Sequence, residues 1–403
     1  MDAAAVKARR LEELEERIAA ALPPQDGEDD YVDETVLRHF EIVQKAGHGN
    51  WSAVWKVVHT DSRRTYALKK MFGVTRSQKD AQRAYRELKH LEVVQNHDNI
   101  VTLFGAFLSP SKWDLYLVLE FMPSDLFAAI RANVLTERHK AYVTYQLFRA
   151  LKYLHSAGII HRDVKPSNIL LKENCHATLC DFSLARSGDY TVEPKSHNNL
   201  AGSPMTDYAG TRWYRAPECL LGSKEYSSAV DMWGAGCTVG EMLTGEVMFP
   251  GTSSEHQMEL ILRVTGRPSK EDIASMNSPF AKVFLEHLPP VDPQALSQMF
   301  SDYSAEALDL LRLLFQVGVS HRMTADQGLS HPYVADFHCP DDEPGCLVDA
   351  SNLLDDNTTF SIADYINEIE ADVAERKSRM RSAEGGMHSK LGYGRSREAI
   401  IGI

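Results

Sequence analysis

Lys69 is a candidate for binding an anion, and Glu87 is a candidate partner for this lysine. Lys69 lies in the strand-like run 66–70, and strand alternation puts Ala67 and Lys69 on the same face. A lysine on the inward face of a strand is costly unless it meets an anion. In the helix predicted over residues 79–94, Glu87 points with apolar neighbours, so we expect its carboxylate to pair with Lys69.

A glycine-rich turn precedes this lysine. Gly47 and Gly49 stand between two strand-like runs, where a backbone without side chains can come close to phosphate groups. The turn does not fit the dinucleotide-binding fingerprint, because a strand rather than a helix follows it and Ser52 replaces the third glycine. Taken by itself, a plain hairpin explains the turn as well.

The strongest pattern lies in the middle of the chain. It runs His161-Arg162-Asp163-Val164-Lys165-Pro166-Ser167-Asn168, then Leu179-Cys180-Asp181-Phe182, then Ala216-Pro217-Glu218. This series resembles the motifs of protein kinases, and the resemblance covers about residues 40–335. It implies that Lys69 holds the α- and β-phosphates of ATP, that Glu87 positions Lys69, that Asp163 accepts the proton of the substrate hydroxyl, and that Asn168 and Asp181 hold Mg²⁺. Lys165 resembles the lysine that serine/threonine kinases direct at the γ-phosphate.

The same resemblance implies a binding site for ATP. The matching positions are Gly47, Gly49, Val54, Ala67, Lys69, Glu120, Met122 and Leu170. Leu119 resembles the residue that gates the back of the adenine pocket. Taken singly, each of these residues is more simply explained as part of the core of a sheet, but together with the catalytic loop they favour an ATP site.

A further segment indicates regulation by phosphorylation. Residues 206–218 resemble the Thr-x-Tyr activation lip of mitogen-activated protein (MAP) kinases, with Thr206 and Tyr208 as the phosphorylated residues. Such phosphates need arginine partners. Those at matching positions are Arg83, Arg86, Arg162 and Arg186 for the phosphothreonine, and Arg212 and Arg215 for the phosphotyrosine. Solvated surface explains any single arginine as well, whereas all of them together indicate a switch.

Among MAP kinases the chain resembles the atypical extracellular signal-regulated kinases of the seven/eight type, through residues 80–83, 120–122, 249–253 and 331–340. This resemblance implies protein substrates and a lip that the enzyme phosphorylates itself, with an upstream MAP kinase kinase as the alternative. It implies a preference for serine or threonine followed by proline, because the segment 209–215 shapes a pocket that disfavours a backbone N–H after the acceptor. The implied locations are the cytoplasm, the nucleus and the ciliary or cytoskeletal base.

Acidic residues predict a docking surface. Asp341, Asp342 and Glu343, together with Asp125, resemble the patch through which MAP kinases bind basic linear motifs. A solvated acidic loop is an equal alternative. Cys339 occupies the first acidic position of the usual patch, which lowers the expected affinity.

One departure from the family concerns Ser183, which stands where protein kinases have glycine. Glycine permits a positive φ that costs serine on the order of 1 kcal/mol. We therefore expect Ser183 to restrict flipping of Phe182 and to slow activation.

A pseudokinase scaffold and a nucleotide sensor are alternative functions, and both are disfavoured because all the catalytic residues are present. The resemblance also implies a buried ion pair between Glu218 and Arg322 and a catalytic loop anchored by Asp231.

Composition and patterning set the organisation of the chain. The net charge of −13 argues against nucleic acid as a main partner, and no apolar run is long enough to span a membrane. The predicted fold class is α+β: a bilobal kinase fold with a small antiparallel β-rich N-lobe carrying one helix, and a larger, mainly helical C-lobe. The expected boundaries are 1–34 for an N-terminal helical extension and linker, 35–121 for the N-lobe, 122–345 for the C-lobe, and 346–403 for a C-terminal extension with one helix and a disordered tail.

Overall fold

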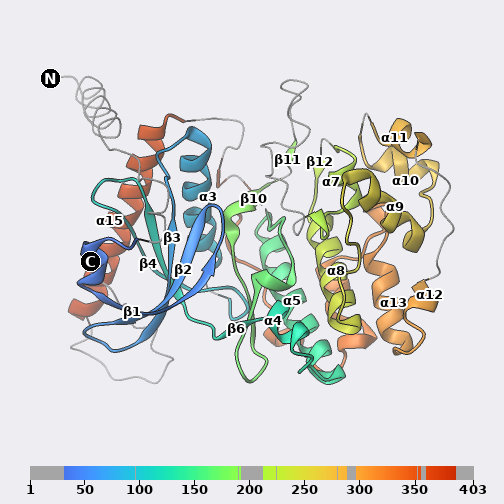
Figure 1. Cartoon of the computed structure of the whole chain (residues 1–403), viewed down its shortest axis with the longest axis horizontal. Helices are drawn as coiled ribbons and strands as arrows, with labels where there is room; N and C mark the ends of the chain where they lie inside the picture. The colour runs from blue at the N-terminus through green and yellow to red at the C-terminus, as the bar shows by residue number, and fades with distance from the viewer. Residues whose placement is uncertain are drawn as a thin grey trace. The chain divides into compact units, whose positions relative to one another are not determined.

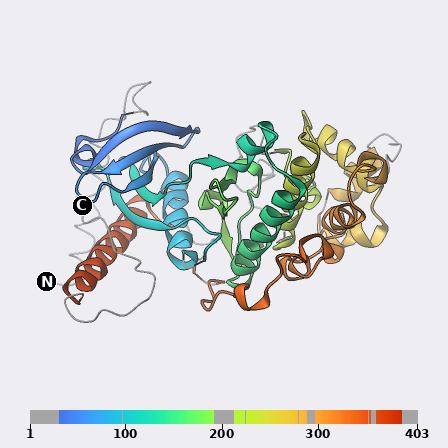
Figure 2. The ribbon, with the colours of Figure 1, turned by 90° about the horizontal axis from the view of Figure 1, so that it is seen from below.

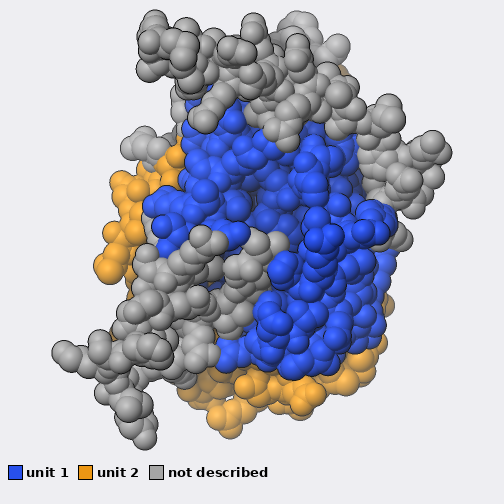
Figure 3. All heavy atoms as spheres, turned by 90° about the vertical axis from the view of Figure 1, so that its left-hand side faces the viewer, with its two compact units in different colours: residues 1–96, 101–122, 355–403 blue, residues 97–100, 123–354 orange. Residues whose placement is uncertain are grey.

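The computed structural model describes residues 31–95, 97–188, 190–191, 212–223, 225–278, 280–287, 296–351, 353–354 and 360–386. The helix predicted within 1–34 and the tail predicted after the C-terminal helix lie outside the described residues. The chain divides into two compact units, coloured separately in Figure 3. Unit 1 comprises residues 1–96, 101–122 and 355–403, and unit 2 comprises residues 97–100 and 123–354.

Unit 1 is built on a five-stranded antiparallel sheet in the order β1-β2-β3-β5-β4 (Figure 1). Its strands are β1 (Phe40–His48), β2 (Ser52–His59), β3 (Thr65–Met71), β4 (Leu103–Leu108) and β5 (Leu115–Glu120). Every second residue of β2 is buried, as expected for a strand with one face on a core. Tyr66 and Leu68 of β3 join Trp55 and Val57 of β2 in one apolar cluster.

The segment before β1 packs on the same face of the sheet. Val32 and Val36, the latter within α2 (Glu34–Leu37), belong to the apolar cluster. Lys70 is buried, donates to the carbonyl of Tyr31 at 2.7 Å and pairs with Asp114 at 3.0 Å. The chain from residue 31 is therefore part of the fold of unit 1.

Two helices complete unit 1. α3 (Gln78–Val94) begins at Ser77, whose hydroxyl accepts a hydrogen bond from the Asp80 amide at 3.2 Å. α15 (Ile362–Gly386) packs against both α3 and β4, and Figure 2 shows α3 and α15 on the same side of the sheet. The C-terminal extension predicted as a separate part thus contributes its helix to unit 1.

Unit 2 is mainly helical. α8 (Ala229–Thr244) is buried along nearly its whole length, as an apolar helix in a core should be. It packs against α5 (Glu137–Ser156), which begins with a capping box formed by Thr136 and His139. A three-stranded sheet joins β6 (Ser124–Asp125), β8 (Ile169–Leu171) and β9 (Ala177–Leu179).

The remaining described elements of unit 2 are short. They are α4 (Leu126–Arg131), β7 (Ile159–Ile160), η2 (Pro166–Asn168), η3 (Phe182–Leu184), β10 (Arg186–Ser187), β11 (Tyr190–Thr191), α7 (Pro217–Leu220), β12 (Glu225–Tyr226), α9 (Ser254–Thr265), α10 (Lys270–Ser275), α11 (Ala281–His287), α12 (Leu296–Met299), α13 (Ala305–Leu314), η4 (Val319–His321), α14 (Ala325–Leu329), η5 (Pro332–Val334) and η6 (Pro340–Asp342). No helix in the described ranges is long and apolar enough to cross a lipid bilayer. A β-rich unit with one internal helix and a mainly helical unit confirm the predicted fold class.

Candidate active site

The predicted pair of Lys69 and Glu87 is present in unit 1. The Lys69 Nζ lies 2.5 Å from Glu87 Oε1, and the side chains are 9% and 1% exposed. In β3 the Lys69 side chain points away from the apolar cluster that contains Tyr66 and Leu68. The helix α3 places Glu87 next to Lys69. A buried ammonium with a carboxylate partner is fixed in place, which suits a group that must hold phosphate oxygens.

The glycine turn links β1 and β2 beside this lysine. In the strand pairing, Gly47 lies opposite Val54, and Val54 lies opposite Lys69. The Gly49 amide donates to the Ser52 carbonyl at 2.8 Å, and a Cβ placed at Gly49 would have no neighbour nearer than 3.8 Å. Neither glycine has a positive φ, so neither is needed for an unusual backbone conformation. Their lack of a side chain leaves space above the backbone, and a phosphate needs this space to approach closely.

Val54, Ala67 and Leu119, predicted adenine-site residues of unit 1, share one face of the sheet, whereas Glu120 lies opposite Tyr66 on the other face. Ala67 lies opposite Leu119 in the β3–β5 pairing, and cross-strand partners point to the same side. Because Ala67 and Lys69 are two residues apart, that side is also the one carrying Lys69. Met122, two residues after β5 ends at Glu120, is 7% exposed. Leu170, the last predicted member, lies in β8 of unit 2.

The catalytic loop of unit 2 brings three predicted side chains together. Asp163 accepts a hydrogen bond on Oδ2 from Asn168 Nδ2 at 2.9 Å and pairs with Lys165 Nζ at 2.6 Å. Asn168 Nδ2 also donates to the Asp163 carbonyl at 2.8 Å, which fixes the amide nitrogen toward the loop. Asp163 is 8% exposed, so its carboxylate is held in a defined and largely desolvated position.

Asp231 anchors this loop, as predicted. Its carboxylate, in the first turn of α8, accepts from the amides of His161 at 2.8 Å and Arg162 at 2.7 Å, and from His155 Nε2 at 2.9 Å. Arg162 has a φ of 68°, a conformation that non-glycine residues rarely adopt. Burial would raise the pKa of Asp231, but its hydrogen bond with His155 and the positive charges around it hold the pKa below its usual value.

The segment that carries Asp181 corrects the expectation for Ser183. Asp181 itself has a positive φ of 65°, whereas Ser183 lies within the 3₁₀ helix η3 and has no positive φ. Ser183 therefore carries no such backbone strain in this conformation, and its expected effect on flipping of Phe182 and on activation stays a prediction. Phe182 is fully buried, with its ring edge-on to His161 at 5.1 Å.

The phosphorylation lip is only partly described. Thr206 and Tyr208 lie outside the described residues, so their environment stays a prediction. Of the six predicted arginines, Arg83 and Arg86 lie in unit 1, and Arg162, Arg186, Arg212 and Arg215 lie in unit 2. The Arg83 guanidinium lies 4.3 Å from the centroid of the Trp51 ring, and Arg212 donates to the Thr252 carbonyl at 3.0 Å.

The acidic docking residues differ in exposure. Asp341 and Asp342 are exposed in η6, and Asp125 is half-buried, its carboxylate accepting from the Ala128 amide at the start of α4. Glu343 is 4% exposed, and its Oε1 accepts from the Cys339 amide at 3.0 Å and lies 2.8 Å from His338 Nδ1. As a correction to the prediction, Glu343 stabilises its own loop and does not present its carboxylate to a partner.

Further buried polar pairs support the site. Glu218 and Arg322 form the predicted buried ion pair, with two contacts of 2.7 and 2.9 Å. A pair that we did not predict joins the Tyr214 hydroxyl to Glu241 Oε2 at 2.6 Å. Burial raises the pKa values of both groups. A glutamate within the mainly apolar helix α8 is the sequence signal that could have indicated it.

Comparison with known proteins agrees with this geometry. The model of the protein kinase domain family matches residues 40–334. The chain is 44% identical over 353 residues to extracellular signal-regulated kinase 2 of Dictyostelium discoideum, covering 88% of this chain and 95% of that kinase. It is 39% identical to mitogen-activated protein kinase 15 of Xenopus laevis and 38% identical to extracellular signal-regulated kinase 7 of Drosophila melanogaster. Those matches cover 87% and 84% of this chain, but 59% and 37% of the two relatives. The chain belongs to the protein kinase family and, within it, to the MAP kinases, which are serine/threonine protein kinases.

Proposed function

We propose that this chain transfers the γ-phosphate of ATP, with Mg²⁺, to serine or threonine followed by proline in protein substrates. The observation that carries the proposal is the arrangement around Asp163, whose carboxylate is held by Lys165 at 2.6 Å and Asn168 at 2.9 Å. Asp163 would accept the proton of the substrate hydroxyl. Lys165 would place positive charge next to the oxygen that attacks and the phosphate that is transferred.

Phosphate binding is proposed for Lys69 and the glycine turn. Lys69 has the charge to hold two phosphate oxygens, and its ion pair with Glu87 at 2.5 Å keeps the ammonium from moving. Glu87 acts through Lys69 and is a positioning residue. The open backbone at Gly47 and Gly49 leaves room for the phosphates to lie against amide groups.

The donors in unit 2 fit Mg²⁺. With Asn168 Nδ2 engaged by Asp163, the amide oxygen remains as the metal ligand, and Asp181 supplies a carboxylate. Mg²⁺ prefers oxygen ligands and takes few from the protein, completing its shell with phosphates and water. The ion would neutralise charge on the transferred phosphate.

Regulation is proposed to act through Thr206 and Tyr208. Each phosphate would add about −1.5 to −2 charges, for which the arginines named above are the natural acceptors. The resemblance of the sequence to the seven/eight type of extracellular signal-regulated kinase is the reason for preferring phosphorylation of the lip by the enzyme itself over an upstream MAP kinase kinase. By the same likeness we place the protein in the cytoplasm, in the nucleus or at the ciliary or cytoskeletal base.

Partner recruitment is proposed for the exposed carboxylates of Asp341 and Asp342, with Asp125. Basic docking motifs complement their charge. Glu343 is left out of this surface because it is buried.

The proposal is tested with the purified full-length chain and radiolabelled ATP. We expect Mg²⁺-dependent transfer to a Ser-Pro peptide, little transfer to the matched Ser-Ala peptide, and a loss of about 10²- to 10⁴-fold for Asp163→Asn, which removes the base. Equal rates for Asp163→Asn and the natural sequence would overturn it.

The same reaction, read by mass spectrometry, tests self-phosphorylation. Label on Thr206 and Tyr208 in the natural sequence, and not in Asp163→Asn, is the expected result. Transfer to the peptide without any lip label would overturn self-phosphorylation and leave the kinase activity standing.

A further inference from the structure

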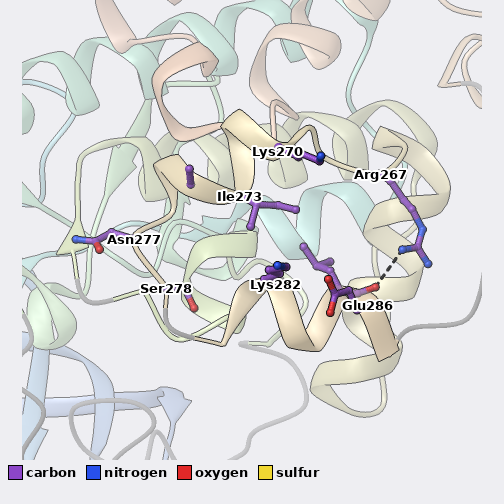
Figure 4. Close-up of a pocket in the computed structure, with 9 residues that line it drawn as sticks. Arg267, Lys270, Ile273, Asn277, Ser278, Lys282 and Glu286 are labelled. Atoms are coloured by element: carbon purple, nitrogen blue, oxygen red, sulfur yellow. Dashed lines mark hydrogen bonds between the residues drawn. The ribbon is translucent and has the colours of Figure 1, made fainter.

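A pocket outside the active-site residues lies between two short helices of unit 2. It has a volume of about 750 Å³, within the range of about 300–1,000 Å³ typical of ligand sites. α10 and the turn after it contribute Lys270, Ile273, Ala274 and Asn277, which share one face at helical spacing. α11 contributes Lys282, Leu285 and Glu286, again on one face, and Figure 4 shows the two faces turned toward each other.

The charges around this pocket are mostly positive. Lys270 and Lys282 are exposed at its sides, and Arg267 lies at one end, opposite Asn277 and Ser278 at the other (Figure 4). The carboxylate among the lining residues is that of Glu286. In a chain with a net charge of −13, the cations Arg267, Lys270 and Lys282 against the one carboxylate of Glu286 make the lining of this pocket locally basic.

The acidic residues of α10 are turned away from the pocket. Asp272 accepts from the Ser269 amide at 2.9 Å and lies 3.4 Å from His321 Nδ1. Glu271 does not line the pocket either, since it falls on the outer face of α10. The lysine of α10, Lys270, thus lines the pocket, whereas Glu271 and Asp272 do not.

The floor of the pocket is apolar and small. Leu285 is buried, Ile273 is half-buried, and Ala274 extends this surface. Arg267 donates to the Leu285 carbonyl at 3.0 Å, which ties the chain after α9 to the last turn of α11 and gives the pocket a fixed end. A floor of this size accommodates one apolar side chain.

We propose that this pocket binds a short acidic peptide segment of a partner protein, with one apolar side chain on the Ile273–Leu285 floor and flanking carboxylates against Lys270 and Lys282. The mouth is open, since most of the lining residues are exposed, and this suits an extended peptide better than an acyl chain, which needs an enclosed apolar channel. An anionic membrane is disfavoured because the net negative charge of the protein would repel it.

This surface would be opposite in charge to the docking residues Asp341 and Asp342 of the same unit. A partner carrying both a basic and an acidic segment could then bind unit 2 at two places, which strengthens binding through effective concentration. The proposal does not depend on phosphoryl transfer.

Fluorescence anisotropy with a dye-labelled peptide, one leucine between two glutamates on either side, tests the proposal. We expect saturable binding that weakens with added salt and falls about fivefold to tenfold in Lys282→Glu and in Lys270→Glu, because each change replaces an attraction by a repulsion. Replacing the leucine of the peptide by glycine should weaken binding by a similar factor.

The matched control is Arg138→Glu, which makes the same change in net charge at an exposed residue of α5 outside the pocket. It should leave peptide affinity unchanged. All variants are first compared by melting temperature, so that a loss of binding is not a loss of fold. An equal loss of peptide affinity in Arg138→Glu and Lys282→Glu would mean that only the net charge of the protein matters, and it would overturn the proposed site. Lys282-dependent binding of vesicles containing phosphatidylserine, without peptide binding, would also overturn it in favour of a membrane.

Discussion

Arg322 is a buried side chain of unit 2 with several hydrogen-bond partners. Its guanidinium contacts both carboxylate oxygens of Glu218, at 2.7 and 2.9 Å, and also donates to the carbonyls of Gln316 and Ala229. Both side chains are almost fully buried. Removing one partner leaves the other charge buried without compensation, and this costs more than the pair itself contributes.

We therefore expect Arg322→Ala to lower the free energy of unfolding by about 3–5 kcal/mol. The control is Arg63→Ala, which removes an ion pair of similar length, 2.6 Å to Glu41, whose side chains are 63% and 56% exposed. It should cost under about 1 kcal/mol. Urea unfolding measures the free energy of unfolding of both variants. A similar decrease in Arg322→Ala and Arg63→Ala would contradict the role of burial.

Residues differ in how far their places follow from sequence. Lys69 and Lys70 are neighbours, yet strand alternation separates them correctly, one toward Glu87 and one toward Asp114. Glu343 was misassigned because nothing in a run of acids tells which carboxylate caps its own loop. At Ser183 the glycine that the family uses does not give the φ of this conformation, which is not positive.

At the scale of elements, α15 supports the helix that carries Glu87. Lys89 of α3 pairs with Asp372 of α15 at 2.6 Å, and Arg376 lies 3.4 Å from Glu92 Oε1. Tyr85 packs on Tyr365 with ring centroids 5.6 Å apart. These contacts lie on the side of α3 that does not carry Glu87, so α15 can hold α3 against the sheet without touching Lys69.

We expect Lys89→Ala to raise the KM for ATP about twofold to fivefold, because a looser α3 holds the Lys69–Glu87 pair less firmly. The matched control is Lys112→Ala, which removes the 2.6 Å pair with Glu370 of the same α15 but lies outside α3. It should lower stability by a similar amount and leave the KM for ATP unchanged. Steady-state kinetics with varied ATP measures both, and an equal rise in the two variants would mean that α3 is not the element that matters.

Elements with a clear period were predicted well, and those defined by tertiary packing were not. The helix expected in the C-terminal extension 346–403 is present as α15, but its docking on α3 and β4 could not be derived from its own period. The boundary predicted at residue 34 separates Val32, in the extension, from Val36, in the N-lobe. Val32 and Val36 nevertheless complete the apolar cluster of the sheet, which depends on residues far along the chain.

For the molecule as a whole, stability should depend on pH through His97. The ring is buried beside Tyr153 at 4.7 Å between centroids, and its Nδ1 accepts from the Asn99 amide at 3.1 Å, which requires an unprotonated nitrogen. Burial, with the charge of Arg149 second, lowers the pKa of His97 to about 4. In the unfolded chain the pKa of histidine is about 6.5.

As pH falls from about 6.5 to about 4, the unfolded state therefore binds a proton at His97 and the folded state does not. The free energy of unfolding decreases by about 3 kcal/mol over this range. His97→Asn has no such proton to take up. We expect the unfolding free energy of the natural sequence to approach that of the variant as the pH is lowered through this window. Urea titrations at several pH values measure it, and a constant difference between the two proteins would contradict the assignment.

Unit 1 consists of three separate segments, whose described residues are 31–95, 101–122 and 360–386. Nearly all of unit 2 lies in the sequence between the second and the third of these segments. Tyr365, Ile366 and Ile369, which are almost fully buried, therefore leave the ribosome after every residue of the catalytic loop. During translation Tyr85 and the side of α3 around it stay uncovered until these residues emerge, so the nascent kinase exposes a surface that the complete fold covers, of the sort that chaperones bind.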